Sequence, residues 1–186
     1  MTNSIGIISP IAVCLSVLTI SHGSDSSKTA PQTAGSSAEK IAAKIEPPTL
    51  AAARRQAEIL HEAMHDTLQI VHHQYYREDQ GLPIPAAILK EVFAELEKEQ
   101  HVTLRWLAVE GQAMNTDHKP QDDFERAAAK ALGSGQRAYE AVEAGLYRRA
   151  GPITLNNHCL KCHVPDRKST EDRTAGLIIS MKIEAD

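Results

Sequence analysis

The residues best suited to chemistry form the run Cys159-Leu160-Lys161-Cys162-His163. C-x-x-C-H is the spacing typical of c-type haem attachment. On one helical turn, two thiols three residues apart can each add to a vinyl group of haem, and the adjacent imidazole can bind the iron from the same side. The run therefore predicts a single haem c, with Cys159 and Cys162 as covalent thioether ligands and His163 as the proximal iron ligand.

Two other uses of this cysteine pair are weaker. The pair can be half of a zinc site completed by His158 and His163, or it can be a redox dithiol. The sequence contains no second C-x-x-C to complete a zinc ribbon, and no thioredoxin-like pattern precedes the pair. Covalent haem is therefore the preferred interpretation.

A second motif, His61-Glu62-Ala63-Met64-His65, matches the H-E-x-x-H pattern of zinc metallopeptidases. On a helix that pattern places two imidazoles on one face, with the glutamate as general base. A chain with nine histidines matches so short a pattern easily, and no third zinc ligand is evident downstream. We keep a metallopeptidase as a minor alternative and expect the protein not to be an enzyme.

The same helix offers candidates for a second iron ligand. Helical geometry places His61, His65 and His72 within about 40° of one another. Met64, Leu68 and Tyr75 flank this stripe, so we expect it to be the buried face. We favour His72 as the distal ligand. The alternatives are His65, His73, Met114 or an open coordination position.

The N-terminal segment predicts export. Ile5 to Ile20 is mostly apolar, no charged side chain precedes Asp25, and the small residues Ser21 and Gly23 permit cleavage. We therefore expect a signal peptide over residues 1–23, a periplasmic or otherwise exported location and no stable membrane span after cleavage. The 16-residue run is shorter than the roughly 20 residues that span a bilayer.

Composition narrows the function classes. The chain has 186 residues, 42% hydrophobic and 24% charged, and a net charge of −4. This length and composition fit one globular domain. Mild acidity gives no reason to expect nucleic-acid binding or a basic membrane patch. The expected partner is a redox protein or a small diffusible ligand.

The sequence predicts an α+β fold, in which long N-terminal helices precede a small antiparallel sheet and the attachment motif lies near the C-terminus. Residues 24–48 are predicted to form a flexible linker with a short helix, and residues 49–186 the haem domain. Hydrophobic periodicity and capping residues place helices over Thr49 to about Glu78, Pro85 to about Glu99, and Asp122 to Leu132. Strands are expected over His101–Val109, Arg137–Val142, Leu146–Leu155 and Gly176–Ile183. A four-helix cytochrome is the alternative fold, but little should follow its attachment motif.

The stretch Ala51–Ile183 resembles the bacterial c-type haem domains with a PAS-like fold, which occur as exported single domains or as extracytoplasmic sensor portions. The resemblance rests on the order of several segments: Tyr75–Glu78 with Leu82–Pro85, Val102–Val109, His118–Pro120 with Phe124-Glu125, Tyr147–Arg149, Ile153–Leu155, Cys159–His163 and Ala175–Leu177. It implies that Cys159 and Cys162 hold the haem and that His163 is proximal. Some members supply a Cys thiolate from the helical half as the other ligand. Because Ala51–Asn157 contains no Cys, that ligand does not transfer to this chain.

One haem on a small exported domain can transfer one electron or report redox state. Electron transfer is the preferred function, because no output module is attached. The alternative is a haem-based redox or gas sensory module that acts through a partner protein. Two strong axial ligands favour electron transfer, whereas an open position favours ligand sensing.

Overall fold

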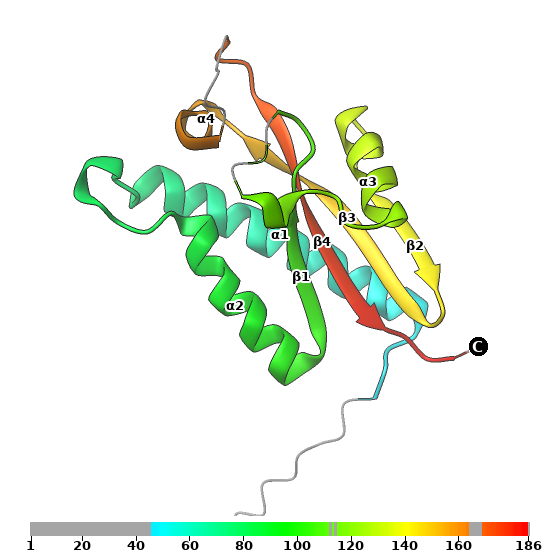
Figure 1. Ribbon diagram of the computed structural model, residues 1–186. Coiled ribbons are helices and arrows are strands. Elements are labelled where there is room, and N and C mark those ends of the chain that lie inside the picture. The colour runs from blue at the N-terminus through cyan, green and yellow to red at the C-terminus, as the bar shows by residue number, and fades with distance from the viewer. Residues whose placement is uncertain (1–45, 112, 114, 164–168, 186) are drawn as a thin grey trace, which may run out of the picture. The chain divides into compact units, whose positions relative to one another are not determined.

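The computed structural model describes residues 46–111, 113, 115–163 and 169–185, and for Glu78, Cys162 and His163 it describes the backbone alone. The predicted signal peptide (1–23), nearly all of the predicted linker (24–48) and Met114 lie outside these residues. All described residues belong to one compact unit, Ala43–Asp186. Helices cover both faces of a single sheet (Figure 1).

The sheet has four antiparallel strands in the order β1-β4-β3-β2. The strands are β1 (Val102–Leu107), β2 (Tyr139–Glu143), β3 (Leu146–Leu155) and β4 (Arg173–Lys182). A two-residue turn joins β2 to β3, and both Ala144 and Gly145 adopt positive φ angles of 49° and 74°. Such a turn matches the right-handed twist of the paired strands. The long central pair β3–β4 is thus the frame on which the other elements pack.

The first helix, α1 (Leu50–Gln74), begins at Thr49, whose side chain accepts a hydrogen bond from the Ala52 amide at 3.2 Å. Ala53, Ala57, His61 and Leu68 form its buried face. The small alanines let the helix approach the sheet closely. The helix ends where the amides of Tyr75 and Tyr76 both donate to the Val71 carbonyl.

The second helix, α2 (Pro85–Gln100), has proline at its first position, where a missing N–H costs no helical hydrogen bond. A 3-10 turn, η1 (Glu78–Gln80), and Gly81 with φ 64° connect it to α1. Phe93 of α2 packs against Trp106 of β1, with ring centroids 4.9 Å apart. The Trp106 indole also donates to the Ala86 carbonyl at 3.0 Å. The two helices and the facing strand residues thereby share one apolar core.

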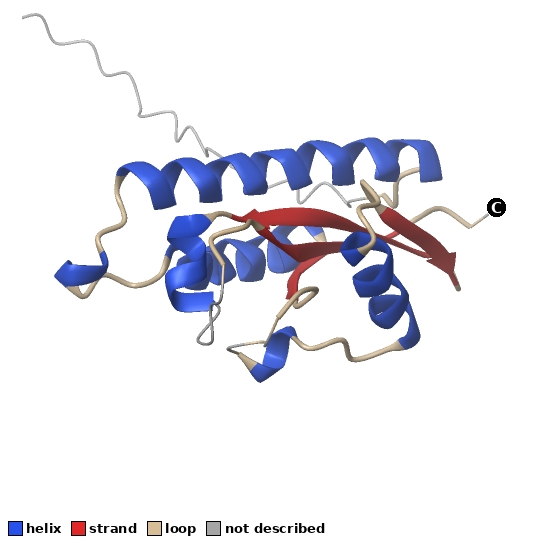
Figure 2. Ribbon diagram, turned by 90° about the horizontal axis from the view of Figure 1, so that it is seen from above, coloured by secondary structure: helices blue, strands red, loops and turns tan. Residues whose placement is uncertain are grey.

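The opposite face of the sheet is covered by α3 (Asp123–Gly133), as Figure 2 shows. Phe124, Ala128 and Leu132 pack against Leu107 and Ile178 of the sheet. Alternate side chains of a strand point to opposite faces, so β4 can supply Ile178 to this core and its two neighbours to the other. The Asp122 side chain caps α3 by accepting from the Glu125 amide at 2.8 Å.

The α+β class, the cap at Thr49 and the bounds of β3 are confirmed, and the helix predicted over Asp122–Leu132 lies one residue later, at Asp123–Gly133. The predicted end of the first helix near Glu78 is wrong, because α1 ends at Gln74 and Tyr75 is its C-cap. Tyr75 was expected on the buried face, yet it is 68% exposed. The last strand begins at Arg173, three residues before the predicted Gly176. Within the described part of the chain, no helix is both long enough and apolar enough to cross a membrane.

Candidate functional site

The attachment motif lies on α4 (Asn157–His163), a short helix that follows β3 directly. Asn156 caps this helix, since its Oδ1 accepts from the amides of His158 at 3.0 Å and Cys159 at 3.4 Å. Asparagine is among the best residues for this role, because the cap satisfies amides that have no partner within the helix. The sequence therefore folds locally into a helical turn that presents the motif at the end of the sheet.

Cys159 occupies an apolar wall of this site. It is 6% exposed and packs with Leu155, Leu160 and Ala175. Its Sγ donates to Asn156 Oδ1 at 3.5 Å, so the residue that caps the helix also orients the thiol. A thiol in apolar surroundings suits addition to the vinyl edge of a hydrophobic ring.

A pocket of about 420 Å³ opens between the C-terminal end of α1 and α4. This volume falls within the ~300–1,000 Å³ typical of small-molecule sites. Polar and aromatic side chains from α1, from the segment that follows it and from α4 line the pocket: His72, His73, Tyr76, Arg77, Asp79, His158 and Lys161. The pocket places two of the predicted distal-ligand candidates beside the helix that carries the attachment motif.

The two histidines differ in their surroundings. His72 is half-buried and its ring lies 4.9 Å from the Tyr76 ring. His73 is exposed and meets the ring of His158 edge-on, with centroids 5.7 Å apart. Of the remaining candidates, His65 lies nearly two turns nearer the helix N-terminus, and Met114 falls outside the described residues.

A smaller, mostly apolar cavity of about 70 Å³ adjoins the residues around Cys159. Leu155 and Ala175, which pack against Cys159, also line this cavity, and Leu68, Trp106 and His118 contribute other walls. Leu68 comes from α1, one turn before His72. The apolar wall around Cys159 is thus continuous with the interior between α1 and the sheet.

Sequence reasoning missed two residues that shape the site, Asn156 and Gln69. Gln69 lies on α1, and its side chain is hydrogen-bonded to both Thr154 and Asn156. An asparagine directly before a helical motif is a recognisable N-cap signal. Nothing comparable marks Gln69, whose partners lie 85 and 87 residues away.

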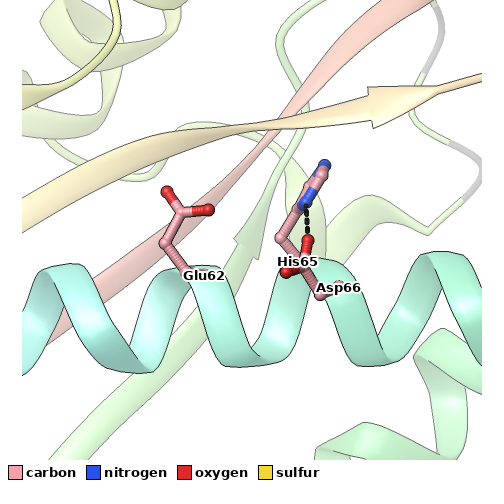
Figure 3. A group of neighbouring side chains, drawn as sticks. All are labelled: Glu62, His65 and Asp66. Atoms are coloured by element: carbon pink, nitrogen blue, oxygen red, sulfur yellow. Dashed lines mark hydrogen bonds and ion pairs between the residues drawn. The ribbon is translucent and has the colours of Figure 1, made fainter.

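The two histidines of the H-E-x-x-H motif stack with ring centroids 6.2 Å apart, but they have different hydrogen-bond partners. His61 is buried, and its Nε2 lies 3.1 Å from the Pro152 carbonyl, to which it donates. Burial lowers the pKa of this imidazole. The neighbouring ligand atoms that do converge, within 4.8 Å of one another, belong to Glu62, His65 and Asp66. Figure 3 shows these side chains on successive turns of α1, with His65 Nδ1 3.1 Å from Asp66 Oδ1.

Comparison with known proteins agrees with this architecture. The solved structure of the cyanobacterial heme-protein Tll0287 superposes with a TM-score of 0.52 at 12% sequence identity, and the match covers 72% of this chain and 98% of that one. A comparison with curated protein sequences finds no match. The Tll0287-like family model matches residues 44–181, which include every described helix and nearly all of the sheet. The chain therefore belongs to the Tll0287-like family.

Proposed function

We propose that this protein is an exported monohaem c-type protein that transfers one electron. The observation that carries the proposal is a C-x-x-C-H motif on a capped helix, α4, whose residues His158 and Lys161 line a pocket together with His72 of α1. The similar solved structure, that of Tll0287, is named as a heme-protein. These features agree with the c-type haem domains of PAS-like fold that the sequence resembles.

The donor set fits a covalently held haem. Cys159 lies in an apolar wall, whereas Arg77 and Lys161 supply positive charge at the lining of the adjoining pocket, suited to carboxylate side groups. Each thiol addition would break one S–H bond and the π bond of one vinyl group and form one C–S and one C–H bond, so it would need no oxidant or reductant. Cys159 and Cys162 would supply these sulfurs, and His163 the proximal imidazole.

When bound, the haem supplies an iron that cycles between two oxidation states by one electron. His72 would supply a second imidazole to hold the iron, since it is half-buried in the pocket wall and its exposed neighbour His73 contacts His158. Two imidazole ligands from the protein would favour electron transfer. An open sixth position would instead favour a redox or gas sensor acting through a partner.

We also propose that the protein is exported and that its partner is a redox protein. Attachment of haem c takes place in exported compartments, and residues 1–23 have the features of a signal peptide. The partner would be a redox protein that delivers or removes a single electron. We propose no catalytic reaction for the protein itself.

The test is replacement of the two motif cysteines. The full chain is expressed through a secretory route together with cytochrome c maturation proteins, and haem is stained on a denaturing gel. Cys159→Ala with Cys162→Ala should abolish staining, whereas Cys14→Ala, in the predicted signal peptide, should leave it intact. Covalent haem in the double variant would overturn the proposal.

A further inference from the structure

We propose that Asn156 and Gln69 are a positioning pair that sets the spacing between the attachment helix α4 and the wall of α1 that carries His72. This inference rests on the proposed haem site and names the residues that hold its two sides together. Gln69 lies one turn before His72 on α1, and Asn156 directly precedes α4. The contact therefore joins α1 to the start of α4, close in the chain to the pocket residues His72 and His158.

The pair is held by a directional series of hydrogen bonds. Gln69 Nε2 donates to the Thr154 carbonyl at 2.7 Å, and Asn156 Nδ2 donates to Gln69 Oε1 at 3.0 Å. Asn156 Oδ1 then accepts from the amides of His158 and Cys159 and from the Cys159 thiol. One series of bonds thus connects β3, α1 and the first attachment cysteine.

The orientation of each amide follows from its partners. A carbonyl can accept but not donate, so the amide nitrogen of Gln69 must face Thr154 and its oxygen must face Asn156. The backbone N–H groups of His158 and Cys159 can donate but not accept. Asn156 therefore turns its side-chain oxygen toward α4 and its side-chain nitrogen toward Gln69. Both side chains are half-buried and the bond between them is partly buried, which strengthens that bond relative to an exposed one.

The other side-chain contact described here between these elements constrains them less. His73 and His158 meet edge-on, but both side chains are exposed and neither is fixed by this contact. The Gln69–Asn156 bond lies deeper and acts on residues adjacent to the motif. Its loss should let α4 shift relative to α1 while the cap of α4 remains.

The variant Asn156→Asp separates the two roles of Asn156, its bond to Gln69 of α1 and its cap of α4. Aspartate caps a helix as well as asparagine does, so the amides of His158 and Cys159 keep their acceptor. The second oxygen of aspartate cannot donate to Gln69 Oε1, so the bond to α1 is lost. Gln69→Leu removes the same bond from the other side, and Gln56→Leu, an exposed position on the same helix, is the matched control.

The experiment measures the absorption spectrum of the oxidised holoprotein, its reduction potential and its melting temperature. Asn156→Asp and Gln69→Leu should each raise the ratio of high-spin to low-spin haem about fivefold, the change expected when one hydrogen bond no longer supports the ligated state. Adding Gln69→Lys to Asn156→Asp should restore the wild-type ratio, because the ammonium can donate to both the Thr154 carbonyl and the new carboxylate. Gln56→Leu should change neither the spectrum nor the potential.

The spectra of the wild type and the variants distinguish a wrong positioning role from a wrong haem proposal. If the wild type carries covalent low-spin haem and both variants keep its spectrum and potential, the positioning role is wrong and the haem proposal stands. A wild-type haem that is already high-spin also overturns the positioning role. Absence of covalent haem from the wild type overturns both.

Discussion

The pocket between α1 and α4 contains adjacent histidines with different surroundings. Helical geometry separates consecutive side chains by about 100°, so His72 and His73 cannot share one environment. The structure places His72 half-buried beside Tyr76, whereas His73 is exposed beside His158. Burial and direction, rather than residue type, therefore distinguish the proposed iron ligand from its neighbour.

Replacement of His72 tests this distinction. In the oxidised holoprotein, His72→Ala should convert low-spin haem to high-spin haem, because the sixth ligand is removed while His163 and both thioethers remain. The measurement is visible absorption, supported by electron paramagnetic resonance. His73→Ala is the control and should keep the low-spin spectrum. An unchanged spectrum in His72→Ala would remove His72 as the ligand.

His61 contributes to stability instead of coordination. Its imidazole is 8% exposed and donates to the Pro152 carbonyl, and burial lowers its pKa below the usual 6.5. It also fills the space above Gly151, where an added Cβ would lie 2.4 Å from Nε2. Close packing of α1 on β3 thus accounts for His61, the first histidine of the H-E-x-x-H pattern.

This buried histidine predicts a pH dependence. Below pH 6.5 the His61 imidazole is protonated in the unfolded chain, whereas burial keeps it neutral in the folded protein down to a lower pH. Stability should therefore fall with pH from about 6.5 down to the lowered folded pKa, by up to about 1.4 kcal/mol per pH unit. Urea unfolding at pH 7.5 and 5.5 should show a smaller loss for His61→Gln, which cannot titrate but can still donate to Pro152.

The control for this prediction is His101→Asn. His101 is exposed at the end of α2 with φ 56°, a conformation that asparagine tolerates. This variant should lose stability on acidification as the wild type does. An equal loss in His61→Gln and the wild type would contradict the role assigned to His61.

At the scale of elements, a buried ion network fixes the loop that lines the apolar cavity. Glu125 of α3 is 3% exposed and accepts from Arg105 at 2.7 Å and from Arg148 at 3.3 Å. Arg105 also donates to the carbonyls of Asp117 and Lys119. These bonds hold the turn η2 (Thr116–His118) against β1, and with it the His118 wall of the cavity.

Removing the charge of Glu125 should therefore be costly. Glu125→Gln removes the carboxylate that pairs with Arg105 and leaves Arg148 paired with the half-exposed Asp122, and we expect the free energy of unfolding to fall by about 3 kcal/mol. Chemical denaturation measures the change. Glu99→Gln breaks an exposed pair with Lys98 and should cost less than about 1 kcal/mol. Similar losses in the two variants would contradict the structural role of the network.

Local signals predict most elements and several of their bounds, but not the end of α1 or the pairing of elements that are distant in the chain. Thr49, Pro85 and Asp122 marked helix starts because capping and proline geometry are local effects. The end of α1 was misplaced by four residues, since no glycine or proline follows Gln74 until Gly81 and Pro83. Tyr75 was assigned to the buried face by periodicity alone, which cannot tell that the helix stops there.

The residues of the site also fall into two groups, those that local spacing identifies and those that depend on distant contacts. The motif Cys159–His163 and the candidate His72 could be found from spacing, because each depends on neighbours within one helix. The strand order β1-β4-β3-β2 and the bond between Gln69 and Asn156 depend on residues far apart in the chain. Periodicity carries no information about such pairs, so the element that holds α1 to α4 emerged from the structure.

At the scale of the whole molecule, the sheet brings the two halves of the site together. β3 leads directly into α4 and also supplies Pro152 and Thr154, which accept hydrogen bonds from His61 and Gln69 of α1. One strand therefore fixes both the attachment helix and the facing helix. This arrangement suits a rigid site whose coordination changes little between oxidation states, as one-electron transfer requires.

The most direct test of the central claim is an alkaline pyridine haemochrome spectrum of the full chain, expressed through a secretory route with cytochrome c maturation proteins. We predict a c-type spectrum that persists in the protein after extraction with acidified acetone, because two thioether bonds keep the haem attached. A protein that carries no haem under these conditions, or one that loses all of it to the solvent, would contradict the account.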